Sequence, residues 1–395
     1  MENKNIVIFG AGKIGRSFIG QLFSRAGYEV IFIDIDKKVI SELNKRNSYQ
    51  VIIKSDKEEI LEITNVRGIM GSEVENVTRA IAACSIMAVS VGKNAFQYIL
   101  PVIAGGIIKR HQEKPDFPLD IILAENIRDA SGIMFIELKK LLPKAFPLKD
   151  YVGLIETSIG KMVPIMPEKV TDKDPLLVYS EPYNTLILSR DCFKNPIPEV
   201  NGLSPKKNMK AWVDRKAFIH NLGHVAAAYS GYYFQPEKKY LFEVLANEKV
   251  FDFTSVVMHE SAKALQKEYP DEFLPEDLES HIEDLIHRFQ NKSLRDTVYR
   301  VGCDLKRKLG ADDRIMGAIR MAQKHQLPLN NLIKTLALGF HFKAKDENGH
   351  YFDYDKLLFI DLERNVSDTI LKTCGFHLPE DRHLLHKTVD EYDKV

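Results

Sequence analysis

Four polar side chains recur close together in an otherwise apolar stretch of the chain: Lys216, His220, Asn221 and His224. If this stretch is one α-helix, a rotation of about 100° per residue puts His220 roughly 40°, His224 roughly 80° and Asn221 roughly 140° from Lys216. All four would then share little more than a third of the helix circumference. Such a stripe offers an amine for proton transfer, and an amide and an imidazole for holding an oxygen atom. The alternative is a solvated helix face with histidines satisfied in a core.

The lysine of this stripe can act as a base near neutral pH only if burial lowers its pKa from about 10.4 towards about 7, a shift of roughly 4 kcal/mol. A closed site between two domains can supply that burial. Asn221 and His224 would then bind the oxygen from which the proton is taken. Lys216 and His224 are about 12 Å apart along a helix axis, so only an extended lysine would approach the histidine.

A glycine-rich turn follows the first apolar run of the chain and reads Gly10-Ala11-Gly12-Lys13-Ile14-Gly15. Gly10 permits a tight turn, Gly12 lets the backbone approach a pyrophosphate, and Gly15 lets the following helix pack closely on the strand. The N-terminus of that helix offers unpaired N–H groups and a positive dipole end. The turn therefore predicts a dinucleotide-binding site; a tight turn without a ligand is the alternative.

Two further residues suit a dinucleotide. Asp34 ends the next predicted strand, where a carboxylate accepts hydrogen bonds from ribose hydroxyls and repels a 2′-phosphate, which favours NAD over NADP. Asp36 and Lys37 stand close enough to make that preference less sharp. Gly92 closes another predicted strand and is a second candidate for backbone contact with NAD, or a plain strand-ending glycine. With NAD bound, the lysine would remove a hydroxyl proton while hydride leaves the same carbon.

The elements that must position these residues differ between the two halves of the chain. Apolar runs at 5–9, 30–33, 85–90 and 119–123 alternate with helical stretches, a pattern typical of parallel strands covered on both faces. Two more β-like runs, 151–155 and 176–188, extend the sheet or form an insertion. Proline and glycine then concentrate at 195–205, where periodicity lapses.

Amphipathic patterns dominate beyond that point, at 209–233, 241–269, 278–289, 293–309 and 329–340. We therefore predict an α/β Rossmann-type N-terminal domain with a parallel-rich sheet and a β extension over residues 1–200. A mainly α-helical substrate and catalytic domain follows over 201–395.

Composition limits the partners of this 395-residue chain. Lys+Arg and Asp+Glu both number 55, so no net field gathers nucleic acid. No apolar run approaches the roughly 20 residues that cross a bilayer, and the start lacks a cleavable apolar segment, so we expect a cytoplasmic protein without a membrane partner. The four cysteines are scattered without a CxxC pair, which favours reduced thiols and no metal site.

The spacing of Lys216, Asn221 and His224 resembles the signature of the long-chain, metal-independent polyol (mannitol) dehydrogenases. The similarity runs over most of the chain and in the same order. It covers Phe9 to Arg16, Asn47 to Val51, Ala124-Glu125-Asn126, Arg288 to Asn291, Asp296 to Gly302, Arg307-Lys308-Leu309, Asp313-Arg314 and Phe340-His341-Phe342.

The resemblance implies an N-terminal NAD-binding domain, a helical C-terminal domain and catalysis in the cleft between them. Lys216 would be the general acid/base, and Asn221 and His224 would polarise the reacting oxygen. By the same resemblance, the substrate is a small polyol or sugar phosphate, with mannitol 1-phosphate oxidised to fructose 6-phosphate or the reverse. Asn126, Arg300 and Lys308 would line the substrate site, with Asn126 also at the cofactor. A plain charged helix face is the alternative for Arg300 and Lys308.

One departure from the family pattern concerns the substrate. The family commonly has an Asp-Arg pair near residue 160, where this chain has Gly160-Lys161, so an expected carboxylate beside the substrate is missing. Two other functions therefore stay open: a hexuronate reductase of the same superfamily, and an NAD(H)-binding protein without catalysis. His341, Lys343 and Arg314 are unranked candidates for binding a phosphate.

Overall fold

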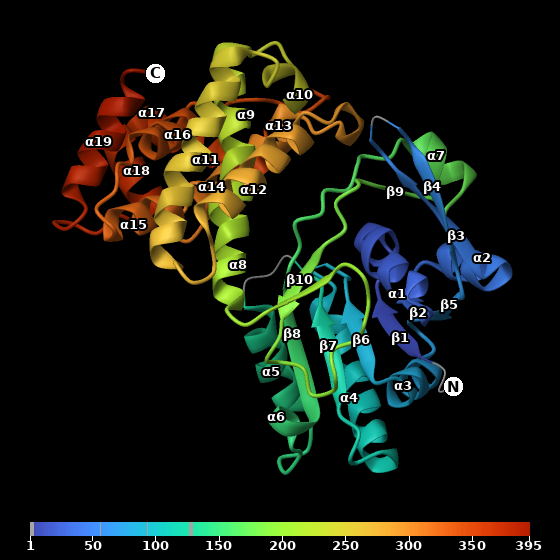
Figure 1. The fold of residues 1–395 in the computed structure, drawn as a ribbon. Helices are drawn as coiled ribbons and strands as arrows, with labels where there is room; N and C mark the ends of the chain where they lie inside the picture. Colours follow the sequence, from blue (N-terminus) through green and yellow to red (C-terminus); the bar gives the residue numbers. More distant parts are fainter. Residues whose placement is uncertain (1–3, 56, 93, 126–128) are drawn as a thin grey trace. The chain divides into compact units, whose positions relative to one another are not determined.

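The computed structural model describes residues 4–55, 57–92, 94–125 and 129–395. The chain forms two compact units, Met1–Trp212 and Val213–Val395 (Figure 1). The first unit is built on β-sheets and the second is helical. The predicted fold class, a Rossmann-type domain followed by a helical domain, is confirmed.

The first unit contains an eight-stranded sheet whose order is β11-β10-β8-β7-β6-β1-β2-β5. Neighbouring strands run parallel except β10, which is antiparallel to β8. The strands are β1 (Asn5–Phe9), β2 (Glu29–Asp34), β5 (Val66–Met70), β6 (Ile86–Val89), β7 (Leu119–Leu123), β8 (Val152–Ser158), β10 (Leu186–Ser189) and β11 (Leu203–Lys206). Strand order reverses at β1, between β2 and β6, and ligands of open α/β sheets bind at the carboxyl edge of such a reversal.

Helices and a second sheet complete the first unit. The helices are η1 (Gly15–Gly20), α1 (Gln21–Arg25), α2 (Lys37–Arg46), α3 (Val74–Ala83), α4 (Phe96–Glu113), α5 (Ala130–Leu141), α6 (Leu148–Tyr151) and α7 (Glu168–Lys173). The second sheet has three strands, β4 (Glu59–Thr64), β3 (Ser48–Ile53) and β9 (Val178–Ser180). The β-like run at 176–188 therefore divides between two sheets: β9 pairs with β3, whereas β10 pairs with β8.

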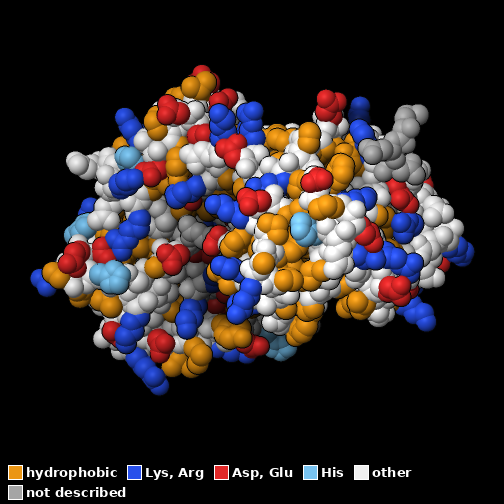
Figure 2. Space-filling model, turned by 90° about the horizontal axis from the view of Figure 1, so that it is seen from below, with side chains coloured by type: hydrophobic (Ala, Val, Ile, Leu, Met, Phe, Trp, Pro, Cys, Tyr) orange, Lys and Arg blue, Asp and Glu red, His pale blue; other side chains and the backbone are white. Residues whose placement is uncertain are grey.

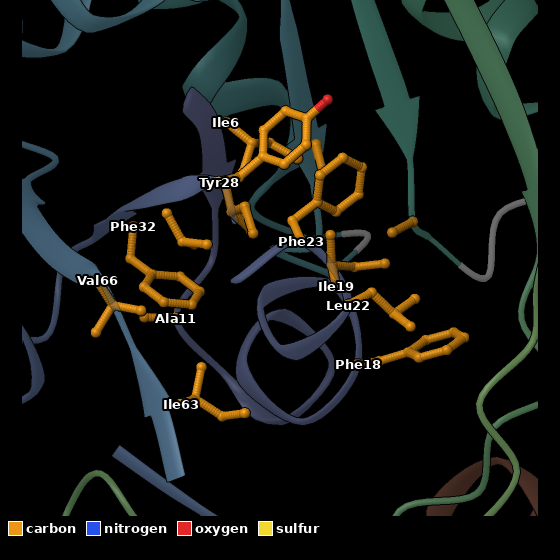
Figure 3. Packing of buried hydrophobic residues seen from close by; sticks show 14 of the residues in the cluster. Ile6, Ala11, Phe18, Ile19, Leu22, Phe23, Tyr28, Phe32, Ile63 and Val66 are labelled. Atoms are coloured by element: carbon orange, nitrogen blue, oxygen red, sulfur yellow. The ribbon is translucent and has the colours of Figure 1, made fainter. Parts of the chain in front are cut away.

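Alternate residues of β1 enter two separate cores. Ile6 and Ile8 belong to one buried cluster, and Val7 and Phe9 belong to the other. Because successive side chains of a strand point to opposite faces, both faces of the sheet are covered, and the strand reads as a continuous apolar run. Figure 3 shows part of the first cluster, which includes Phe18 and Ile19 of η1, Leu22 and Phe23 of α1, and Phe32 of β2.

The second unit begins within α8 (Met209–Arg215) and consists of helices. They are η2 (Lys216–Asn221), α9 (Leu222–Phe234), α10 (Leu241–Val244), α11 (Glu248–Glu268), α12 (Pro275–Phe289), η3 (Lys292–Leu294), α13 (Val298–Gly302), α14 (Leu305–Lys308), α15 (Arg314–Lys324), α16 (Asn330–Phe340), α17 (Asp353–Arg364), α18 (Val366–Cys374) and α19 (Arg382–Tyr392). Nearly every residue of α9 from Leu222 to Gly231 is buried, and α11, α13 and α16 pack against this helix.

Three amphipathic runs do not form the single helices that their periodicity suggests. The run at 241–269 divides into α10 and α11, with a break at 245–247. The run at 209–233 contains a π-helical turn, η2, between α8 and α9. The run at 293–309 breaks into three short helices, and Asp304 at the second break has a left-handed backbone with φ 69°. The Asp355 carboxylate accepts the N–H groups of Asp304 and Leu305, at 3.0 and 2.7 Å. This support comes from a distant helix, so local periodicity could not reveal it.

The surface follows the balanced composition. On the face shown in Figure 2, basic and acidic side chains are interspersed with apolar ones. Within the described ranges, no helix combines the length and apolar character needed to span a membrane.

Candidate active site

The glycine turn lies at the carboxyl end of β1. Gly10 has φ +96°, a left-handed conformation, and a Cβ there would lie 2.4 Å from the Ser90 carbonyl oxygen. A Cβ on Gly15 would lie 1.9 Å from the Gly10 carbonyl oxygen. Gly12 differs, because a Cβ there would meet nothing within 4 Å, and the residue is exposed. Protein packing therefore requires two of the glycines, and the third leaves its backbone open to a ligand.

The rest of the turn leads into the first helix. Ala11 is buried, Lys13 is exposed and Ile14 is half-buried. The Arg16 N–H donates to the Gly12 carbonyl at 3.0 Å, so helical hydrogen bonding starts within the turn. The arrangement matches a helix N-terminus that presents N–H groups to an anion.

Asp34, at the end of β2, is hydrogen-bonded to the glycine turn. Its Oδ2 accepts the Ala11 N–H at 2.7 Å, and its Oδ1 accepts the Asp36 N–H at 3.0 Å. A carboxylate has about four acceptor positions, so these bonds orient the group and still permit bonds from hydroxyls. The Asp36 side chain instead caps α2 by accepting the N–H groups of Lys38 and Val39. The structure thus separates the roles of the two aspartates.

Gly92 lies just beyond β6, on the same carboxyl edge. It has φ +84°, and its N–H donates to Oε1 of Glu125 at 2.8 Å. Burial raises the pKa of Glu125, against the effect of this hydrogen bond. Asn126, predicted for cofactor and substrate, lies outside the described residues.

Lys161, which stands where the family has an Asp-Arg pair, is buried within the first unit. Its ammonium donates to the Tyr183 carbonyl at 2.6 Å, to Asn184 Oδ1 at 3.0 Å and to the Glu181 carbonyl at 3.2 Å. It also lies 5.1 Å from the centre of the Phe18 ring. These contacts give the lysine a structural role beneath η1.

The predicted catalytic residues of the second unit lie on and after the π-helical turn η2. The Leu222 N–H reaches back to the Ala217 carbonyl, five residues earlier, in place of the α-helical partner four residues earlier. Residues five apart therefore approach the same face, so Lys216 and Asn221 are closer in direction than an α-helix would allow. Single π-helical turns within α-helices are frequent at functional sites.

Lys216 is half-buried, and burial lowers its pKa to about 8, with the Arg314 guanidinium adding to the effect. Arg314 is held by Asp313, with Nε donating to Oδ1 at 2.6 Å, and its Nη1 donates to the Asn221 carbonyl at 3.5 Å. A lysine with this pKa can both give and accept a proton near neutral pH.

One histidine, His220, lies within this turn, and a second, His224, follows it in α9. His224 is stacked on Phe289, with ring centres 4.6 Å apart and an interplanar angle of 11°, and its Nε2 lies 3.2 Å from Asp296 Oδ2. Burial lowers the pKa of His224, and Asp296 opposes that effect. His220 is buried beside these two rings, and burial and neighbouring cations lower its pKa well below the usual value. Both imidazoles are therefore neutral at pH 7.

The two predicted substrate cations have different surroundings. The side chain of Arg300 is 53% exposed, and its Nη2 donates to Asp296 Oδ1. Lys308 is buried, and its ammonium donates to the Val301 carbonyl at 2.7 Å and to the Cys303 carbonyl. Burial lowers the pKa of Lys308 to about 8. Lys308 thus holds the end of α13, the helix that carries Arg300.

Sequence reasoning missed Asp296, which contacts both His224 and Arg300. The available signal was its position four residues before Arg300, the spacing of an ion pair on one helical face. Among the described residues, no group of three or more His, Cys, Asp or Glu side chains is arranged to hold a metal ion.

A Rossmann-type sheet with an open glycine turn, followed by a helical unit that carries a lysine of lowered pKa, defines a two-domain oxidoreductase. Residues 4–202 match the family model of the mannitol dehydrogenase Rossmann domain, and residues 208–370 match that of the mannitol dehydrogenase C-terminal domain. The chain belongs to the mannitol dehydrogenase family, whose members act on CH–OH groups, and the resemblance seen in the sequence is confirmed.

Similar proteins extend over most of the chain. Mannitol-1-phosphate 5-dehydrogenase of Streptococcus mutans is 33% identical over 348 residues, covering 87% of this chain and 89% of that protein. The enzyme of the same name from Lactococcus lactis subsp. lactis is also 33% identical, with 87% and 88% covered.

Two solved structures share the fold. The ternary complex of Pseudomonas fluorescens mannitol 2-dehydrogenase with NAD and D-mannitol has a TM-score of 0.73 at 15% identity, covering 99% of this chain and 91% of that one. Substrate-free D-sorbitol dehydrogenase has a TM-score of 0.80 at 15% identity, covering 98% and 92%.

Proposed function

We propose that this protein interconverts mannitol 1-phosphate and fructose 6-phosphate with NAD(H), using Lys216 as the general acid/base. The similarity to mannitol-1-phosphate 5-dehydrogenases over 87% of the chain supports the substrate. The observation that carries the chemistry is the lowered pKa of Lys216, about 8, on a turn shared with Asn221.

The residues of the first unit fit a dinucleotide. The open backbone at Gly12, with no atom within 4 Å of a built Cβ, leaves room for a pyrophosphate. Gly10, Ala11, Lys13, Ile14 and Gly15 form the rest of the turn. Asp34 would bind the ribose hydroxyls and repel a 2′-phosphate, which selects NAD over NADP. Gly92 and Asn126 complete the proposed cofactor set, and bound NAD supplies the hydride acceptor.

In the oxidation direction, the neutral amine of Lys216 takes the hydroxyl proton of the substrate. The Asn221 amide donates to the reacting oxygen and stabilises the negative charge that develops on it, and the His224 imidazole binds the hydroxyl group of the substrate. In the reverse direction, the Lys216 ammonium returns the proton. A base with a pKa near the working pH serves both directions.

We assign the substrate anion to Arg300, whose exposed guanidinium has donors beyond the one used by Asp296. Lys308 contributes to substrate binding through α13, since its ammonium holds two carbonyls at the end of that helix. Asn126 is the third proposed substrate residue.

The test is NADH oxidation followed by its near-ultraviolet absorbance, with fructose 6-phosphate, fructose, fructuronate and tagaturonate as acceptors. We expect fructose 6-phosphate to give the highest kcat/KM, and NADH to be preferred over NADPH. A preference for either uronate would replace the proposed substrate by a hexuronate. Binding of NADH, seen by fluorescence, without turnover of any acceptor would overturn the enzymatic proposal.

A further inference from the structure

The Asp296 carboxylate bridges two residues that the proposed function places at the substrate. Its Oδ2 lies 3.2 Å from His224 Nε2, and its Oδ1 accepts a hydrogen bond from Arg300 Nη2. Asp296 itself is only 6% exposed. We propose that Asp296 is a positioning residue that fixes His224 and Arg300 relative to each other, so that the orientation of the reacting hydroxyl and the binding of the anion depend on one carboxylate. This inference rests on the proposed function.

The backbone around Asp296 is tied down on two sides. The Asp296 carbonyl accepts the Leu241 N–H at 2.9 Å, and the Val298 N–H donates to the Lys239 carbonyl at 2.9 Å. Thr297, between them, caps α13 by accepting the Arg300 N–H at 3.1 Å. The carboxylate therefore projects from a short segment held by both α13 and the residues before α10, and its position is well defined.

Two contacts determine the orientation of the His224 ring. Stacking on Phe289, which is 2% exposed, sets the plane of the imidazole. The carboxylate then selects which nitrogen lies next to it. Because Nε2 faces Asp296, Nδ1 is the nitrogen turned away from the carboxylate. Such a partner fixes the imidazole orientation and favours a proton on the nearer nitrogen.

The negative charge of Asp296 acts on His224 in addition to the steric contact. The charged groups that act most strongly on His224 are Asp296 and the guanidinium groups of Arg300 and Arg314. Neutral His220 lies beside the ring on η2, with ring centres 6.1 Å apart. Of these groups, the carboxylate is the one that raises the pKa of His224 and favours a proton on Nε2. An amide of the same shape would keep the packing and lose this effect of the negative charge.

The proposal is tested with Asp296→Asn, Asp296→Glu and the double variant Asp296→Asn/His224→Asn. Asp368→Asn is the matched control, because Asp368 pairs with Lys372 at the same four-residue spacing on the exposed helix α18. We expect Asp296→Asn to lower kcat by about 10–100-fold and to leave NADH affinity within about twofold of wild type. Asp296→Glu should recover part of kcat, and Asp368→Asn should match wild type.

The double variant shows whether Asp296 acts through His224. If it does, adding Asp296→Asn to His224→Asn lowers kcat no further, because residues that act as a unit are not additive. Fully additive losses, or an unchanged kcat in Asp296→Asn, would overturn the proposal. If thermal melting shows that Asp296→Asn is unfolded, the same cycle is run with Asp296→Glu.

Failure of the proposed function gives a different result. In that case, the wild-type protein oxidises NADH with none of the acceptors. The interaction between Asp296 and His224 is then measured by NMR from the chemical shifts of the imidazole nitrogens of His224, which are assigned by comparison with His224→Asn. Asp296→Asn should shift the titration of His224 to lower pH, since the carboxylate raises its pKa. An unchanged titration would reject the role of Asp296 independently of turnover.

Discussion

The Ala11 N–H donates to Asp34 Oδ2 across 2.7 Å, so the glycine turn and the carboxylate at the end of β2 form one hydrogen-bonded unit. A ligand that engages the open backbone at Gly12 therefore meets a carboxylate whose position the turn itself fixes. Removing that carboxylate should therefore weaken ligand binding and also remove a hydrogen bond that holds the glycine turn.

For this reason, we expect Asp34→Ala to weaken NADH binding by about 10–100-fold, since hydrogen bonds to charged groups contribute about 1.5–3 kcal/mol. Fluorescence titration measures the affinity, and NADPH is titrated alongside. The ratio of NADPH to NADH affinity should rise, because the repulsion of a 2′-phosphate is removed. Asp36→Ala, which removes only the cap of α2, is the control; an equal loss of NADH affinity in both variants would contradict the assignment.

Lys216→Ala should lower kcat by about 10²–10⁴-fold, the usual contribution of a general acid/base. NADH affinity should stay close to wild type, because the proposed cofactor residues belong to the other unit. Steady-state kinetics and fluorescence titration provide the two readouts. Turnover at the wild-type rate would exclude Lys216 as the base.

The pH dependence follows from the pKa of Lys216, about 8. Oxidation of the polyol requires the neutral amine, so the kcat/KM for oxidation should rise with pH and level off above about 8. Reduction of the ketose requires the ammonium, so the kcat/KM for reduction should fall as the pH rises through about 8. Arg314→Gln removes a neighbouring cation, which raises the pKa of Lys216 and moves both profiles to higher pH. Lys324→Gln, on the same helix but paired with Glu268 at the surface, should leave the profiles in place.

Glycine substitutions should separate packing from ligand binding. Gly15→Ala places a Cβ against a backbone carbonyl and should cost about 1–3 kcal/mol or more of folding free energy. Gly12→Ala should leave the unfolding free energy within about 0.5 kcal/mol and weaken NADH at least about tenfold. Denaturant unfolding and NADH titration distinguish the two variants. Tight NADH binding by Gly12→Ala would show that no phosphate approaches this backbone.

Lys161→Met tests whether the departure from the family pattern is structural. Loss of the ammonium removes its hydrogen bonds to the Tyr183 and Glu181 carbonyls and to the Asn184 amide oxygen, and a hydrogen bond to a charged group contributes about 1.5–3 kcal/mol. We expect a lower melting temperature with little change in KM. Lys45→Met, at a side chain that is 74% exposed, is the control. A large rise in KM without loss of stability would instead indicate that Lys161 contacts substrate.

Much of this architecture could be predicted from local sequence. The strands at 5–9, 30–33 and 119–123 are evident because both faces of each strand are buried, which removes polar alternation. The roles of Gly10 and Gly15 could be predicted because few other residues tolerate a tight turn or such a close approach of two backbone segments. The stretch that carries Lys216, Asn221 and His224 is helical, as its apolar periodicity predicted.

What could not be predicted depends on contacts between distant segments. The carboxylate beside His224 comes from Asp296, far along the chain, and the buried ammonium groups of Lys161 and Lys308 find backbone carbonyls that no spacing rule reveals. The π-helical turn at η2 could not be predicted either, because side-chain periodicity does not show which carbonyl accepts the hydrogen bond of each N–H group. Strands β3 and β9 join a sheet of their own for the same reason.

The wide turn at η2 makes this segment unusually sensitive to length. Deleting Ala217 would let the hydrogen bonds close in the ordinary four-residue pattern, and the helix would become more regular. The same deletion would swing Lys216 by about 100° around the axis relative to Asn221 and His224. The number of residues in the π-helical turn η2 therefore sets the direction of the Lys216 amine, although this turn departs from regular α-helical geometry.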